Sequence, residues 1–165
     1  MKLKFSALVI TFVLCGNAFA SDLLPKIKQM SKEKYLSTMP KAMNDAIIKN
    51  GGKLQAGAGS TMIGVQRIGD MMVTIFELEY SAVASILKNS PNIGSDNVKT
   101  FIKSKYFKEG MFGKNGLEKI YMLNYSCSQP LKLEVMKKGI ITKYKYLLST
   151  GEYLGEFNIS IEMCK

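Results

Sequence analysis

The sequence predicts an α+β fold, in which a small antiparallel sheet carries helices packed on one face and ends in a β-hairpin stapled by one disulfide. Two pairs of strand-like segments, each joined by a short glycine-containing turn, occur in the middle and at the end of the chain. Apolar residues at helical spacing occupy the regions before and between these pairs. Cys127 and Cys164 form an even pair, which is typical of one disulfide in an exported chain.

The first 20 residues, MKLKFSALVITFVLCGNAFA, have the pattern of a signal peptide. Lys2 and Lys4 precede an apolar run that is too short to span a bilayer, and the AFA before residue 21 is the small-x-small pattern of a cleavage site. We therefore expect cleavage after Ala20, which leaves a single domain over residues 21–165 in the periplasm.

Cys15 raises the alternative of a lipoprotein. A lipoprotein needs a small residue directly before the acylated cysteine, and Leu14 stands at that position. We therefore expect a protein without a lipid anchor. No later stretch has enough uninterrupted apolar residues to predict a transmembrane segment in the mature chain.

The N-terminal part of the mature chain is expected to form two helices and a turn. The lysine-rich segment 21–38 has apolar residues at helical spacing, and Pro40 is expected to end that helix. Residues 42–49 are expected to form a short helix, closed by the glycines at 51–52. Residues 55–61 are small and glycine-rich without the spacing of a phosphate-binding loop, and they predict a turn.

The next segment is expected to form two strands, over residues 62–68 and 71–80, around a Gly69-Asp70 turn. Alternation in the second strand places Phe76, Leu78 and Tyr80 on one face, and Glu77 and Glu79 on the other.

The middle of the chain predicts further helices separated by loops. Residues 81–88 are expected to form a short helix and residues 89–94 a loop, after which Ser95 caps a helix that runs to about Phe107. A glycine-punctuated loop is expected over residues 110–116. Residues 117–125 favour a helix, although a strand stays open, because four apolar or aromatic residues share one helical face: Leu117, Ile120, Tyr121 and Tyr125.

The C-terminal part predicts a helix over residues 130–139, a strand over 140–148 and a final strand that reaches Met163. The stretch EFNISIEMC alternates between apolar and polar residues, which is typical of a half-buried strand. A disulfide between Cys164 and Cys127 would hold this terminal strand and contribute about 4 kcal/mol in the chain-entropy model. Metal binding by the two cysteines is the alternative, which the absence of histidine disfavours.

These C-terminal motifs resemble a family of small exported bacterial domains of uncharacterised function. The resemblance depends on Cys127, PLKLEVMKKG ending at Gly139, TKYKY at 142–146, Gly151 and Cys164. It implies a frame that stabilises the fold and carries no catalytic residue. The segment is also similar to disulfide-stapled pilotins, which are small partners of outer-membrane secretin channels and are usually lipoproteins.

The composition disfavours an enzyme. With no histidine in the chain, a Ser-His or Cys-His nucleophile pair and an ordinary zinc site are excluded. The sequence has two SxxK matches, Ser31 to Lys34 and Ser85 to Lys88, and a short motif of this kind arises by chance. Glu77 and Glu79 could imitate a glycosidase pair, but an exposed strand face explains them better. We expect no catalytic residue, no cofactor and no metal.

The charge and the methionines favour a binding protein. The net charge is +10, and lysine supplies nearly all of it, with Arg67 as the one arginine. Nucleic-acid readers favour arginine, so nucleic acid is not the expected partner. The charge favours attraction to an acidic protein, to anionic lipid headgroups or to the cell-wall polymer, and solubility alone is the alternative. We expect another envelope protein, which could be acidic. Methionine side chains suit an adaptable binding groove. The expected partner-binding residues are Met71, Met72, Glu77, Glu79, Lys32 and Lys34.

The sequence therefore predicts a non-enzymatic periplasmic binding protein that serves as an accessory factor of an envelope machine, such as a secretion or pilus system. The alternative is a periplasmic immunity or inhibitor protein that neutralises a toxin or a hydrolase. Both classes are compatible with a small, exported, disulfide-stapled chain.

Overall fold

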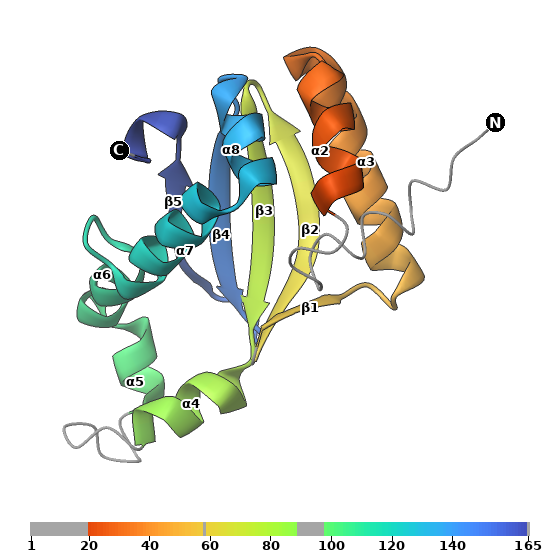
Figure 1. Ribbon diagram of the computed structural model, residues 1–165. Coiled ribbons are helices and arrows are strands. Elements are labelled where there is room, and N and C mark those ends of the chain that lie inside the picture. The colour runs from red at the N-terminus through yellow and green to blue at the C-terminus, as the bar shows by residue number, and fades with distance from the viewer. Residues whose placement is uncertain (1–19, 58, 89–97, 165) are drawn as a thin grey trace.

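The computed structural model describes residues 20–57, 59–88 and 98–164, and it contains a five-stranded sheet in the order β1-β2-β3-β4-β5 (Figure 1). Helices precede the sheet and connect β3 to β4. The α+β class is therefore confirmed. The strands are β1 (Leu54–Gly57), β2 (Ser60–Ile68), β3 (Met71–Leu78), β4 (Ile141–Leu148) and β5 (Tyr153–Ile159).

The sheet is mixed, which corrects the expectation that all its strands are antiparallel. β3 and β4 lie side by side in parallel, while the other three pairs are antiparallel. Parallel neighbours require a long crossover connection, which a run of helices provides here. These helices are α4 (Tyr80–Lys88), α5 (Val98–Lys103), α6 (Lys105–Phe112), α7 (Leu117–Ser128) and α8 (Pro130–Lys137).

The expected single helix over 21–38 is wrong, because two helices, α2 (Ala20–Gln29) and α3 (Lys32–Lys49), meet at Ser31. The Ser31 hydroxyl accepts a hydrogen bond from the Lys34 backbone N–H at 3.2 Å and caps α3.

Pro40 does not end this helix, as the sequence predicted, but lies buried inside α3. Proline removes one backbone hydrogen bond, and the burial of Met39, Met43 and Ile47 along the continuous helix outweighs that loss. The end of α3 is as expected, since Asn50 caps it and Gly51 follows with a φ of 74°.

Three further boundaries differ from the prediction. The helix expected to reach Phe107 breaks at Ser104, whose hydroxyl caps α6 by accepting from the Phe107 backbone N–H at 3.2 Å. The loop expected over 110–116 begins later, because α6 continues to Phe112. The turn expected over 55–61 is shorter, since its flanking residues belong to β1 and β2. Residues 89–94 and Ser95 lie outside the described residues.

The remaining predicted elements agree with the structure. The β2–β3 turn falls at Gly69-Asp70, and the segment 81–88 belongs to α4. β4 and β5 form the expected C-terminal hairpin, and a disulfide joins Cys127 to Cys164 with a Cα–Cα distance of 5.4 Å. The strand expected to reach Met163 stops at Ile159, however, because the chain turns into the 3₁₀ helix η2 (Ile161–Met163) to meet Cys127 at the end of α7.

The helices cover one face of the sheet. In β4 the side chains of Thr142, Tyr144, Tyr146 and Leu148 are buried, and those between them are partly exposed. The buried side chains form two clusters, one between α3 and β1–β2 and the other between α6–α7 and β4–β5. In Figure 1, α2 and α3 lie toward β1 and β2, while α5 to α7 lie toward β5. This arrangement leaves a boundary between the two clusters above the centre of the sheet.

No helix within the described ranges is both long enough and apolar enough to cross a membrane.

Candidate binding pocket

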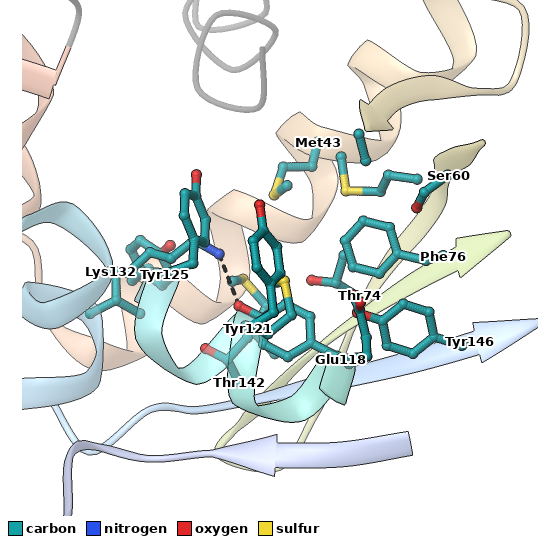
Figure 2. Close-up of a pocket in the computed structure, with 17 residues that line it drawn as sticks. Met43, Ser60, Thr74, Phe76, Glu118, Tyr121, Tyr125, Lys132, Thr142 and Tyr146 are labelled. Atoms are coloured by element: carbon teal, nitrogen blue, oxygen red, sulfur yellow. Dashed lines mark hydrogen bonds between the residues drawn. The ribbon is translucent and has the colours of Figure 1, made fainter. Parts of the chain in front are cut away.

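A pocket of about 500 Å³ opens where the two clusters meet. Its floor consists of side chains from the central strands β3 and β4, including Thr74, Phe76 and Tyr146. One wall comes from α3 and β2, and the opposite wall comes from α7 and α8. Figure 2 shows the lining side chains converging on this space from both walls.

Methionines supply much of the apolar lining. Met43 comes from α3, Met62 from β2, Met72 from β3 and Met122 from α7, so four different elements contribute one each. Methionine is unbranched and polarisable, and it adapts to irregular apolar partners. The pocket wall can therefore reshape around a ligand without large movements of the backbone.

The floor is rigid by comparison, because its aromatic rings pack in stacked and tilted pairs. The ring centroids of Phe76 and Tyr146 are 5.4 Å apart, and those of Tyr146 and Phe112 are 4.9 Å apart. Phe157 lies 5.8 Å from Tyr146 and 5.6 Å from Tyr144. Thr74 and Thr142 are small residues among these rings, and their size leaves room above the floor.

Two buried tyrosines keep their protons at physiological pH. The Tyr146 hydroxyl donates a hydrogen bond to Glu118 Oε1 at 2.7 Å. Burial raises the pKa of Tyr146 well above its usual range, and the Glu118 carboxylate raises it further. Burial also raises the pKa of Tyr35 in the opposite wall. Both phenols are therefore neutral, and the proton of the Tyr146 hydroxyl is donated to Glu118.

Lys132 places a positive charge in the pocket wall. Its ammonium donates to the Tyr144 hydroxyl at 2.9 Å and lies 5.0 Å from the centroid of the Tyr125 ring and 5.2 Å from that of Tyr144 (Figure 2). The Tyr144 hydroxyl also lies 3.2 Å from the buried Ser126 hydroxyl. The lysine is therefore held by its hydrogen bond to Tyr144 and by a cation–π contact with Tyr125.

α7 presents an apolar stripe to solvent beside the pocket. Leu117, Ile120 and Tyr121, which the sequence placed on one helical face, are exposed, whereas Met122 and Ser126 are buried. The Tyr121 side chain is 64% exposed and also lines the pocket. The exposed stripe is thus continuous with the pocket through this residue.

The structure spreads the sequence-predicted partner residues over both ends of β3. Met72 lines the pocket, whereas Met71 starts the strand outside the lining. Two of the other four form ion pairs, Lys32 with Asp70 at 2.7 Å and Glu77 with Lys53. The backbone N–H of Glu79 donates a hydrogen bond to the Gly59 carbonyl, and Lys34 is exposed. A partner-binding surface made of all six residues stays a prediction.

The sequence reasoning missed most of the pocket. Tyr144 and Tyr146 were recognised only as part of a structural motif, and Lys132 only as part of a short helix. A usable signal was present on α7, where Glu118, Tyr121 and Tyr125 recur at intervals of three and four residues and so share a helical face.

The two SxxK serines have structural surroundings. Ser31 uses its hydroxyl to cap α3, and Ser85 is exposed on α4. Among the described residues, no group of three or more aspartate, glutamate or cysteine side chains is arranged to hold a metal ion.

The structure is that of an α+β protein with a pocket over the centre of its sheet. No protein-family model matches the chain, and no curated protein matches it either.

The comparison with solved structures finds matches at low sequence identity and with TM-scores below 0.5. The pilotin EpsS of the Vibrio vulnificus type 2 secretion system has 10% identity and a TM-score of 0.47, and the match covers 81% of this chain and 96% of EpsS. The type II secretion pilotin AspS of Vibrio cholerae has 8% identity and a TM-score of 0.44, over 81% and 95% of the two chains.

A third structure, from Pseudomonas aeruginosa, is described as that of a secreted protein. It has 11% identity and a TM-score of 0.43, over 88% of this chain and 93% of that one. At this level of similarity the likeness does not assign a function to the chain.

Proposed function

We propose that the protein is a non-enzymatic accessory factor of an envelope machine, such as a secretion or pilus system, and that it binds an apolar segment of another envelope protein. The pocket between α3 and α7 is the observation that carries this proposal. Its volume of about 500 Å³ suits the insertion of several apolar side chains.

The lining supports binding of a protein segment. Flexible methionine side chains from four elements surround the space, and aromatic residues form its base. Grooves that accept an amphipathic helix commonly combine such an adaptable apolar surface with a helix at the rim. The exposed stripe on α7 extends the apolar surface beyond the pocket, as an elongated partner would require.

Export supports the same proposal. The N-terminal pattern predicts a signal peptide, and the disulfide between Cys127 and Cys164 is a bond that persists in oxidising compartments. We therefore place the protein in the periplasm, where an envelope partner is available. Residues 1–19, which contain Cys15 and all of the predicted signal peptide except Ala20, lie outside the residues that the structure describes.

Affinity capture from the cell envelope tests the proposal. The oxidised protein comprising residues 21–165 is immobilised beside two variants, Tyr121→Ala and Ile48→Ala. Tyr121 lines the pocket, and Ile48 is a control because it is exposed (71%) on α3 and does not line the pocket. Neither substitution removes a buried side chain, so both variants should fold.

We expect the original protein and Ile48→Ala to capture the same envelope protein, and Tyr121→Ala to lose most of it. Equal capture by all three would place the partner away from the pocket. If no envelope component is captured, the alternative gains weight, in which the protein is an immunity or inhibitor protein with a foreign target.

A further inference from the structure

Lys132 differs from the cations that neutralise carboxylates elsewhere on the surface. Within the described ranges, the ion pairs are Lys32–Asp70, Lys53–Glu77, Arg67–Glu33, Lys103–Glu152 and Lys143–Glu156. Lys132 forms no ion pair with any carboxylate of the described residues. It is half-buried in the pocket wall, where a charge is less well hydrated than on the open surface.

The ammonium group has unused hydrogen-bonding capacity. A lysine ammonium has three N–H donors, and the Tyr144 hydroxyl is its hydrogen-bond acceptor among the described residues. The ring of Tyr125 attracts the charge without accepting a conventional hydrogen bond. Two donors therefore remain for a ligand in the pocket.

The position of Lys132 in its helix opposes local stability. Pro130 begins α8, so Lys132 lies in the first turn, where the helix dipole favours negative rather than positive side chains. The first turn of α8 contains no acidic residue that would offset the lysine. Residues that break a local rule in this way are often found at functional sites.

The pocket is also electrically polarised. Lys132 contacts the Tyr125 ring, and Glu118 lies seven residues before Tyr125 on α7. Two full turns of helix separate Glu118 from Tyr125 by about 10 Å along the axis. Positive and negative charges therefore lie toward opposite ends of the α7 wall, which favours one orientation of a charged ligand.

We infer that the protein segment bound in this pocket carries an aspartate or glutamate, whose carboxylate accepts hydrogen bonds from Lys132 while neighbouring apolar side chains pack on the methionines. This inference rests on the proposed function, since it names the chemistry of the partner for the same pocket. A charge-assisted hydrogen bond in a partly desolvated site would select this partner over a neutral one.

A displayed library of amphipathic helical 12-residue peptides provides the test. Selection is carried out on the oxidised protein of residues 21–165 and on two variants, Lys132→Met and Lys145→Met. Lys145 is a matched control, because its ammonium lies 6.0 Å from the Tyr153 ring centroid and it does not line the pocket. Lys145→Met removes the same charge as Lys132→Met. Melting temperatures establish that the variants fold, and Lys132→Gln replaces Lys132→Met if the latter does not.

We expect the original protein and Lys145→Met to select peptides with an acidic residue at a fixed spacing from apolar residues. Lys132→Met should lose that enrichment. In a selected peptide, replacing the acidic residue by its amide should weaken binding about tenfold to the original protein and less than twofold to Lys132→Met.

Three outcomes would overturn the inference. Equal acidic enrichment with Lys132→Met would mean that the overall basic charge attracts the peptides. Selection of peptides without acidic residues would leave the proposed function in place and remove the role of Lys132. If no peptide is selected but decanoate binds in a Lys132-dependent manner, the pocket takes a small amphiphile, and the proposed function fails as well.

Discussion

At the scale of single residues, the Tyr144 hydroxyl joins the pocket to the core. It accepts from Lys132 at 2.9 Å, and its own proton is available for the Ser126 hydroxyl at 3.2 Å. Tyr144 and Ser126 are each 1% exposed, so water cannot replace a lost partner at little cost. One oxygen atom therefore orients the charged side chain and satisfies a buried polar group.

Tyr144→Phe should destabilise the fold by about 1–3 kcal/mol, because the Ser126 hydroxyl loses its buried partner. Urea unfolding followed by circular dichroism measures the change. Tyr153→Phe is the control, since this tyrosine is largely exposed and should unfold at an unchanged urea concentration. Equal midpoints for the two variants would contradict the role assigned to the Tyr144 hydroxyl.

Gly155, on β5, leaves room for the side chain of Phe112. A Cβ atom at this position would lie 2.7 Å from the Cβ, Cγ and Cδ2 atoms of Phe112, which belong to the fixed part of that side chain. Gly155→Ala should therefore cost about 1–3 kcal/mol through overpacking. A Cβ atom at Gly64 would make only an ordinary contact, 3.7 Å from Ile75 Cδ1, so Gly64→Ala should have a much smaller effect. Thermal unfolding of the two variants measures the difference. Similar losses for both variants would refute the argument.

At the scale of elements, local signals account for the structure where an element closes on itself. The Gly69-Asp70 turn and the C-terminal hairpin were predictable because short turns bring adjacent strands together. The break at Ser31 was not predictable, because the helical spacing of apolar residues continues past Ser31, which in the structure caps α3. On α7 the spacing predicted one apolar face, but spacing alone could not show that most of this face is exposed to solvent instead of packed in the core.

The disulfide makes a prediction about α7. It attaches the C-terminal end of α7 to the residue after η2, and α7 forms one wall of the pocket. Reduction should lower the free energy of unfolding by as much as about 4 kcal/mol in the chain-entropy model. Thermal unfolding with and without dithiothreitol measures this loss. A Cys127→Ser, Cys164→Ser double variant should not respond to the reductant, and a reductant-insensitive original protein would mean that the bridge contributes little.

At the scale of the whole molecule, the pocket could not be predicted because it depends on the pairing of β3 with β4. These strands are separated in sequence by α4 to α8, and neither strand contains a local signal that specifies the other as its parallel neighbour. Only this pairing brings Phe76 and Thr74 beside Tyr144 and Tyr146. The sequence therefore indicated the kinds of elements and the disulfide but not the site that they form together.

The buried tyrosines predict how stability depends on alkaline pH. Burial raises the pKa of Tyr35 and Tyr146 in the folded state, whereas an unfolded tyrosine ionises near pH 10. Above about pH 10 the folded state therefore binds more protons than the unfolded state, and stability falls as the pH rises. Urea midpoints from pH 8 to 11 should show this decline, and Tyr146→Phe should make it shallower. A slope that Tyr146→Phe does not alter would contradict the assignment.

Export of the whole chain makes a prediction about its mass. The protein recovered from the periplasm should have the mass of residues 21–165 less two hydrogen atoms, owing to cleavage after Ala20 and one disulfide. Intact mass spectrometry tests both features together. A lipidated product that begins at Cys15 would contradict the prediction and favour a membrane-anchored protein.

The parallel pairing at the centre of the sheet also imposes an order on folding. β1, β2 and β3 can assemble as soon as they are synthesised, but the free edge of β3 waits for β4, which follows only after all the crossover helices. Such distant pairing slows folding, and an uncovered strand edge invites pairing with other chains. Until β4 pairs with it, the edge of β3 is therefore open to pairing with other chains.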